Sequence, residues 1–366
     1  IIDFLGTKYV SKIGYRRSVI IAQALSVIGL CMIPIMPKLM GNKFLALEIA
    51  MIFCGLGGGL IEVLISPIVE ACPTTRKSAI MSILHSFYCW GQMGVILISS
   101  ILLAVSGGAW KFIPICWAAL PITLMILFFF LPIPEKAPEG GVNTGENPRL
   151  QKLGRGFLLF IVVMICAGAA EQGVAQWASY FAEKGLGSTN LLGNLLGRCM
   201  FAFFMAVGRT LLGIMGNKMN VQKILTASAI LSSVCYLAIA FLPSPMLSLA
   251  ACALSGFAVS IMWPATLDLA ASAFVCGTSA FSLLSLAGDI GCTLGPSVNG
   301  FVSDLINDTS LTGSFAKILK ISPDQAAIRL GFAVTALFSV IMIFTLIRIS
   351  QVFFAKNRLT RSEEPK

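Results

Sequence analysis

The chain has 366 residues, of which 57% are hydrophobic and only 11% are charged. Soluble domains are about 25% charged, and long apolar runs recur along this whole chain, so the composition excludes a mainly soluble protein. The runs are continuous and do not alternate with polar residues, which indicates transmembrane helices rather than the strands of a membrane barrel.

The net charge of +10 does not indicate a nucleic-acid partner, because the Lys and Arg residues lie in short loops between apolar runs. The 11 cysteines lie mostly inside those runs without a CxxC pair, and His85 is the single histidine. We therefore expect packing cysteines, no metal and no cofactor. The sequence has neither an HExxH motif nor a GxxxxGK[ST] loop, so we expect neither an enzyme nor an ATP-driven pump.

Ten apolar runs are long enough to cross a membrane as helices. They cover approximately 18–37, 45–70, 78–104, 110–132, 157–182, 190–215, 222–242, 246–273, 277–302 and 327–352. We therefore expect an all-α, multi-pass membrane protein.

The loops between these runs differ in positive charge, alternating along the chain. The richer set holds Lys12, Arg16, Arg17, Arg76, Lys77, Lys136, Arg149, Lys152, Arg155, Lys218, Lys223, Lys356, Arg358, Arg361 and Lys366. The poorer set holds Lys38, Lys43, Lys111, Lys184 and the acid-bearing segment 303–326. The positive-inside rule makes the richer set cytoplasmic, so we expect a plasma-membrane protein with a cytoplasmic C-terminus.

One polar stretch divides the chain into two halves. The segment "IPEKAPEGGVNTGENPRLQKLGRG", residues 133–156, is rich in Pro, Gly and charge, which is typical of a linker. We expect an N-terminal half over 1–132, a C-terminal six-helix half over 157–352 and a cytoplasmic tail over 353–366.

The two halves repeat each other. "GLIEVLISP" (59–67) corresponds to "GFAVSIMWP" (256–264), and "WGQMG" (90–94) to "AGDIG" (287–291), both at an offset of 197 residues. Both copies of the basic loop fall on the cytoplasmic side, so the repeats are parallel. This arrangement suits a transporter whose site lies between two halves near the membrane midplane.

The basic loop "SKIGYRR" (11–17) corresponds to "NKMNVQK" (217–223) at an offset of 206. Two complete helices precede the second copy, but only ten residues precede the first. We therefore expect the intact protein to have twelve helices, six in each half. The first helix and most of the second would lie upstream of this fragment.

These features resemble the major facilitator superfamily, whose loop motif is roughly G-x-x-x-(D/N)-(R/K)-x-G-(R/K)-(R/K). The matching residues are Gly213, Asn217 and Lys218 in the second half and Lys12, Gly14 and Arg16 in the first. The resemblance implies a fold of two six-helix repeats, a secondary transporter driven by an ion gradient, and gating roles for these loop residues.

The helices around "GLGGGLIEVLISPIVEACP" and "MSILHSFYCWGQMG" resemble those of the fucose-permease-like sugar/proton symporters. Glu62 and Pro67 match that family's E-T-x-x-N-P helix. In its L-N-x-A-Q-x-F-N helix, His85 takes the place of Gln and Tyr88 that of the second Asn. The resemblance implies that Glu62 is the membrane acid of a symporter.

Glu62 and His85 lie at similar depths on adjacent predicted helices, about 11 Å from the cytoplasmic ends at 1.5 Å per residue. A carboxylate beside an imidazole can pass a proton at neutral pH. We expect the two to couple transport to protons. The alternative is a structural hydrogen bond between the helices.

Further polar residues at membrane depth are candidates for substrate binding. Glu171 shares a segment with Gln172, Gln176 and Trp177. This segment would present an acid, amides and a ring to a polar organic solute. Alternatively, Trp177 with Tyr180 forms an aromatic belt at the outer membrane surface.

Asp289 is the repeat counterpart of Gln92, and we expect both residues, with Tyr88, to line the cavity. Alternatively, Asp289 lies at a small-residue helix contact made by the neighbouring glycines. The pair Trp263-Pro264 marks either a broken helix at the site or a packing kink. We interpret Arg209 as a gate residue that snorkels towards the cytoplasmic surface.

The function expected from these patterns is secondary active transport of a small polar organic solute, such as a sugar, coupled to protons. The expected partners are the solute, a proton or other ion, and the lipid bilayer, and we expect a monomer. Proton-driven efflux of drugs or metabolites is one alternative. A receptor or scaffold that transports nothing is another.

Overall fold

The computed structural model describes residues 13–71, 77–133, 155–186, 190–215, 220–274, 278–307 and 309–354. Every regular element formed by these residues is a helix, which confirms the all-α prediction. Within the same residues, eight helical stretches are long and apolar enough to cross a membrane. The predicted residues Lys12, Asn217 and Lys218 lie outside the described part of the chain.

The helices follow the ten predicted runs closely. The first group comprises α2 (Tyr15–Leu39), α3 (Lys43–Ala71), α4 (Lys77–Val105), the short 3₁₀-helix η1 (Trp110–Phe112) and α5 (Ile113–Phe130). The second comprises α6 (Arg155–Ala175), α7 (Ala178–Leu186), α8 (Asn190–Asn194), the π-helix η3 (Leu195–Cys199), α9 (Met200–Met215), α10 (Val221–Phe241), α11 (Pro245–Val259), α12 (Met262–Ala273), α13 (Thr278–Ile306), α14 (Ser310–Leu319), α15 (Pro323–Ile349) and the π-helix η5 (Ser350–Phe354).

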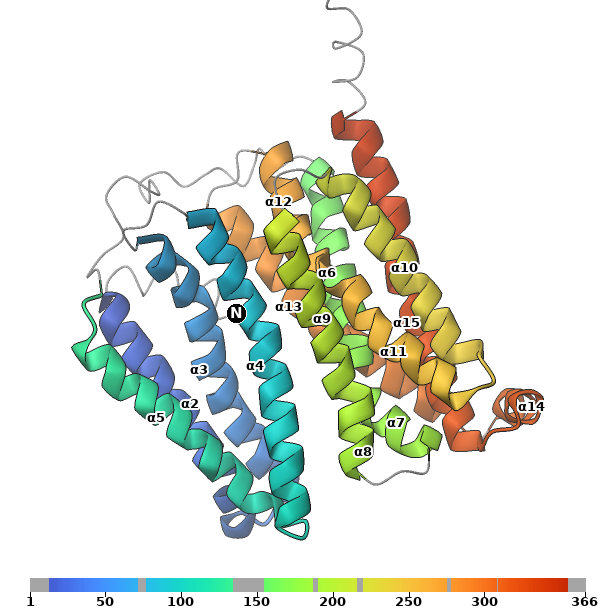
Figure 1. Cartoon of the computed structure of the whole chain (residues 1–366), viewed down its shortest axis with the longest axis horizontal. Helices are drawn as coiled ribbons and strands as arrows, with labels where there is room; N and C mark the ends of the chain where they lie inside the picture. Colours follow the sequence, from blue (N-terminus) through green and yellow to red (C-terminus); the bar gives the residue numbers. More distant parts are fainter. Residues whose placement is uncertain are drawn as a thin grey trace, which may run out of the picture. The chain divides into compact units, whose positions relative to one another are not determined.

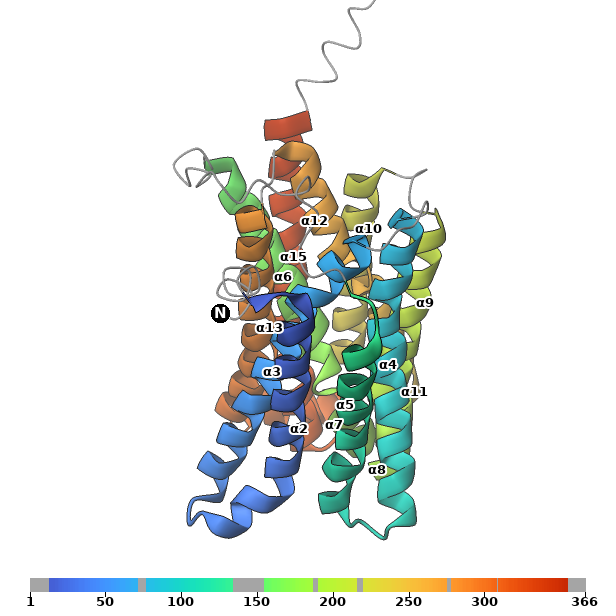
Figure 2. The ribbon, with the colours of Figure 1, turned by 90° about the vertical axis from the view of Figure 1, so that its left-hand side faces the viewer.

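The chain forms two compact units, one of residues 1–84 and 101–146 and the other of residues 85–100 and 147–366. In the first unit, α2 packs against both α3 and α5 (Figure 2). Glycine permits the close approach of α2 to α3, because a Cβ on Gly57 would lie 2.3 Å from the Ser26 hydroxyl oxygen.

The first turn of α2 carries the basic loop motif. Gly14 has φ of 89°, a left-handed value that glycine adopts without steric cost, and this explains the glycine of the motif. The Arg16 Nη2 donates to the carbonyl of Leu131 at 2.8 Å, and Leu131 is the C-cap of α5. A cation is favourable at this negative end of a helix dipole, so Arg16 ties the start of α2 to the end of α5.

In the second unit, α6 packs against α13 and α15, while α10 packs against α11 and α15 (Figure 1). Glycines of α13 set the distance to α6. A Cβ on Gly291 would lie 2.1 Å from the Ile165 carbonyl oxygen, and one on Gly295 would lie 2.2 Å from that of Ala169. The small-residue contact considered for this helix therefore exists, and it involves these glycines.

Three of the predicted runs are interrupted rather than continuous. Residues 176–177 separate α6 from α7, residues 260–261 separate α11 from α12, and a π-helix over 195–199 precedes α9. In addition, the segment expected only as a loop over 303–326 contains the ten-residue helix α14. The break between α11 and α12 lies directly before the predicted Trp263-Pro264 pair, which is in the first turn of α12, and the candidate site is built around it.

Candidate functional site

The break between α11 and α12 follows from Pro264. In a continuous helix, the carbonyl of Ser260 would accept a hydrogen bond from the backbone N–H of residue 264. Proline has no N–H to donate, so this carbonyl is left for another donor. The Nε of Arg209 on α9 donates to it at 2.9 Å. The helix is interrupted directly before Trp263-Pro264, and a role for this interruption at a transport site stays a prediction.

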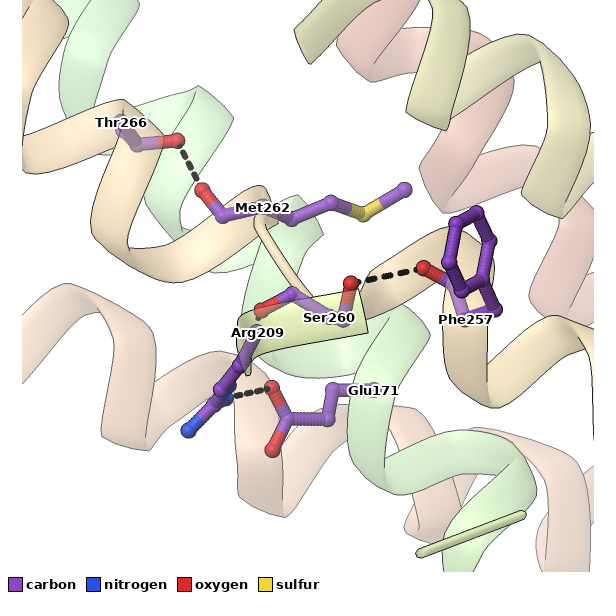
Figure 3. A network of polar contacts seen from close by, with 6 residues as sticks. All are labelled: Glu171, Arg209, Phe257, Ser260, Met262 and Thr266. Atoms are coloured by element: carbon purple, nitrogen blue, oxygen red, sulfur yellow. Dashed lines mark hydrogen bonds and ion pairs between the residues drawn. The ribbon is translucent and has the colours of Figure 1, made fainter. Parts of the chain in front are cut away.

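The same guanidinium forms an ion pair with Glu171 of α6. Arg209 Nη2 lies 3.1 Å from Glu171 Oε2, and the two side chains are only 11% and 7% exposed. Figure 3 shows the guanidinium between the Glu171 carboxylate and the backbone of Ser260. The interpretation of Arg209 as a snorkelling residue is therefore wrong, because its charge is buried against an internal acid instead of reaching the membrane surface.

Residues 85–100 of α4 lie beside α9 within the second unit. The Arg209 guanidinium carbon lies 5.4 Å from the centre of the Tyr88 ring, a cation–π contact. Trp90 Nε1 donates to the Thr210 hydroxyl at 3.4 Å, and its ring packs edge-on against Phe203. Tyr88, proposed from the sequence as a substrate residue, is thus in contact with the buried ion pair.

Arg198 is a residue that the sequence reasoning missed. It lies in the π-helix η3, its side chain is half-buried, and its Nε is buried without a hydrogen-bond partner. Its guanidinium is within electrostatic range of Tyr88. A charge inside a predicted span is a functional signal, so its position in the run 190–215 could have identified it.

The other predicted site residues in this unit differ in their contacts and in their burial. Trp263 packs on α13, since a Cβ on Gly288 would lie 2.2 Å from its ring. Trp177 is held against the same helix by its Nε1, which donates to the Pro296 carbonyl at 3.1 Å. The remaining residues are Gln172, Asp289 and Gln92, which are half-buried, and Gln176, which is exposed at the break after α6.

Glu62 is exposed on α3 in the first unit. His85 lies within α4, but its side chain is outside the described part of the structure. The pairing of these two residues stays a prediction. Gly213 lies in α9, and a gating role for it likewise stays a prediction.

A family model described as Major Facilitator Superfamily matches residues 1–296. The chain belongs to this superfamily. It is accordingly a multi-pass integral membrane transporter, in agreement with its apolar helices. None of the curated proteins compared with it is a significant match.

Solved structures of other superfamily transporters share the fold. The E. coli fucose:proton symporter has 16% identity and a TM-score of 0.67, with 96% of this chain and 88% of that chain covered. A D-xylose–proton symporter has 15% identity and a TM-score of 0.69, with 92% and 83% covered. A bacterial homologue of the human lysosomal transporter Spinster has 15% identity and a TM-score of 0.64, with 97% and 93% covered.

Proposed function

We propose that this superfamily member takes up a small polar organic solute, such as a sugar, together with protons. It would do so by alternating access. Two of the solved structures that share its fold are sugar:proton symporters. The sugars in those names are substrates of those two proteins. The proposal for this chain rests on its own side chains.

The observation that carries the proposal is the buried ion pair of Glu171 and Arg209 at the break between α11 and α12. Ionisable groups inside a membrane protein are costly and are usually placed at solute or ion pathways. Broken helices at such sites offer backbone groups that no helix bond occupies. In this protein the pair and the break coincide, which favours a polar solute over an apolar one.

The proposed substrate contacts are the candidate residues predicted from the sequence at membrane depth. They are Tyr88, Gln92, Glu171, Gln172, Gln176, Trp177, Trp263 and Asp289. Amide and hydroxyl groups can orient a polyhydroxylated solute, and tryptophan rings can stack on its apolar face.

We further propose that Glu62, with His85, carries the coupled proton. An acid that is alternately exposed to two solutions can bind and release a proton within each transport cycle. The basic loop residues Gly14 and Arg16, and those that correspond to them in the second half, would act at a cytoplasmic gate, with the C-terminus on the same side.

Uptake into proteoliposomes tests the proposed function. With an acidic exterior and a neutral lumen, a panel of labelled sugars including fucose and xylose should yield at least one that accumulates above its external concentration. A protonophore should abolish this accumulation. Active uptake of hydrophobic cations into inside-out vesicles would instead favour efflux. Failure of every solute to move in either direction would favour a receptor or scaffold.

A further inference from the structure

Two arginines lie near Tyr88 and differ in their partners. The Arg209 guanidinium carbon lies 5.4 Å from the centre of the Tyr88 ring, and the Arg198 guanidinium is within electrostatic range of Tyr88. Arg209 is paired with Glu171. Among the residues that the structure describes, no carboxylate forms an ion pair with Arg198.

An arginine half-buried inside a membrane protein without an anion is expensive to maintain. Arg198 is also far from the ends of its helical run, because eight residues separate it from the start of α8 and seventeen from the end of α9. A helix rises about 1.5 Å per residue, so the nearer end is roughly 12 Å away. The cost is offset if Arg198 meets an anion during the transport cycle.

A second, independent observation concerns Gln92. Its side-chain oxygen Oε1 is buried and has no hydrogen-bond donor within the described structure. Gln92 follows Tyr88 by four residues on α4, so the two side chains lie on one face of that helix. A buried amide oxygen without a donor can accept a hydrogen bond from a hydroxyl group of a bound solute.

We infer that the substrate is a small hydroxylated monocarboxylate, such as a sugar acid, with its carboxylate bound by Arg198 beside Tyr88 and a hydroxyl donating to Gln92. This inference rests on the proposed transport of a polar solute and narrows its class. A planar guanidinium matches a carboxylate through two parallel hydrogen bonds. The negative charge of the solute would give Arg198 the ion-pair partner that it lacks among the described residues.

Matched pairs of solutes separate charge from shape. D-gluconate and D-sorbitol have similar hydroxyl patterns but differ in the carboxylate, and so do D-glucuronate and D-glucose. Binding is measured on the purified full chain in detergent by tryptophan fluorescence, for which Trp90 is a nearby reporter through its contact with Thr210. Thermal unfolding with each solute gives a second readout, since a ligand that binds the folded state raises the melting temperature.

In each pair, we expect the acid to bind at least tenfold more tightly than its neutral partner. Arg198→Gln should weaken binding of the acid by about 10- to 100-fold, which is the range for a lost charge-assisted hydrogen bond, and should leave neutral solutes unaffected. Arg198→Lys should bind the acid with an intermediate affinity. Lysine keeps the positive charge but lacks the planar guanidinium that forms two parallel hydrogen bonds. Gln92→Leu should weaken the hydroxylated acids more than acetate.

One further variant controls for charge. Arg348→Gln removes an exposed arginine of α15 that contacts Gln351, and it should not change binding.

Equal binding of acid and neutral partner would overturn the inference, and so would unchanged binding of the acids in Arg198→Gln. The proposed function would still stand in both cases if a neutral sugar accumulates. Conversely, tight binding of the acids without any uptake in proteoliposomes would contradict the transport proposal and leave the carboxylate site intact.

Discussion

At the scale of single residues, Glu171 and Arg209 show how a charged pair can persist among apolar helices. Each side chain alone would be an uncompensated charge, and the pair also requires the remaining hydrogen-bonding groups to be satisfied. The Ser260 carbonyl satisfies the Nε of Arg209. The Tyr88 ring lies against the guanidinium and adds an electrostatic contact. The pair is therefore supported by two further segments of the chain.

Removing only one partner of this pair should be strongly destabilising. Arg209→Ala leaves the Glu171 carboxylate buried and unpaired, so the free energy of unfolding should fall by about 3–5 kcal/mol. The double variant Glu171→Gln with Arg209→Gln removes both charges and should recover most of that loss. Thermal unfolding in detergent measures both variants. Equal losses in the single and double variants would show that the ion pair is not what stabilises this region.

A separate residue-scale prediction concerns proton coupling. Glu62→Gln cannot bind and release a proton, so it should abolish uphill accumulation but retain exchange of labelled for unlabelled solute. Glu48→Gln, which alters an exposed acid near the start of the same helix, is the matched control. His85→Ala should alter the pH dependence of uptake between about pH 5 and 8. Accumulation by Glu62→Gln driven by a pH gradient alone would refute the assignment.

The sequence patterns predict an internal position for Glu171, the acid of the buried pair. They place its cationic partner, Arg209, wrongly at the membrane surface. Glu171 was recognisable because a carboxylate lies in an apolar run. Arg209 was assigned to the membrane surface because it lies near the end of its run, and long side chains usually extend outwards there. The carbonyl that accepts the hydrogen bond of Arg209 belongs to Ser260, which lies 51 positions later in the chain. Partners this far apart in the chain cannot be deduced from spacing along one helix.

At the scale of helices, Pro264 determines where α11 ends and how Arg209 is held. Pro264→Ala restores an N–H that can bond to the Ser260 carbonyl, in competition with Arg209. Uptake should therefore fall about tenfold or more, as expected when one charge-assisted contact is lost. Stability should be maintained because a helix bond is gained. Pro245→Ala is the control, since Pro245 occupies the first turn of α11, where no helix bond is lost. Normal uptake by Pro264→Ala would mean that the break is only a packing feature.

The close contact between α6 and α13 gives another prediction. Gly291→Ala would place a Cβ 2.1 Å from the Ile165 carbonyl, so the helices must separate. A loss of about 1–3 kcal/mol in the free energy of unfolding is expected from such overpacking. Gly94→Ala, at the corresponding position of the first repeat, has nothing within 4 Å of the added Cβ. It should be neutral or slightly stabilising, because alanine favours helix. Similar melting temperatures for the two variants would contradict this packing.

Helix positions were predictable, but their interruptions mostly were not. Runs of apolar residues locate helices because every backbone group must be satisfied inside a membrane. The break at Pro264 has a local cause in the missing N–H, so it could be anticipated. The break at residues 176–177 has no proline or glycine within it, and it lies where the Trp177 indole is bound to α13. That contact is tertiary and leaves no local sequence signal.

At the scale of the whole molecule, the internal repeat was the strongest sequence signal for the fold, since parallel six-helix repeats are a feature of this superfamily. The repeat does not predict function position by position. Gly94 and Gly291 correspond in the sequence, yet only Gly291 has a close neighbour. Asp289 corresponds to Gln92, so the acid occurs in one copy only. The repeat therefore predicts the fold, but it does not predict which side chains form a site.

The orientation of the protein in the membrane gives the last prediction. The positive-inside rule places the start of α10 in the cytoplasm and α14 outside. Lys223 and Lys317 are exposed residues of these two helices. In a background with all 11 native cysteines replaced, Lys317→Cys should react with a membrane-impermeant thiol reagent in intact cells. Lys223→Cys should react only after the membrane is permeabilised, because its thiol faces the cytoplasm. The reverse pattern would invert the assigned topology and place the C-terminus outside. Labelling of both sites in intact cells would show that the reagent enters, so a variant without cysteines and an intracellular marker protein must remain unlabelled.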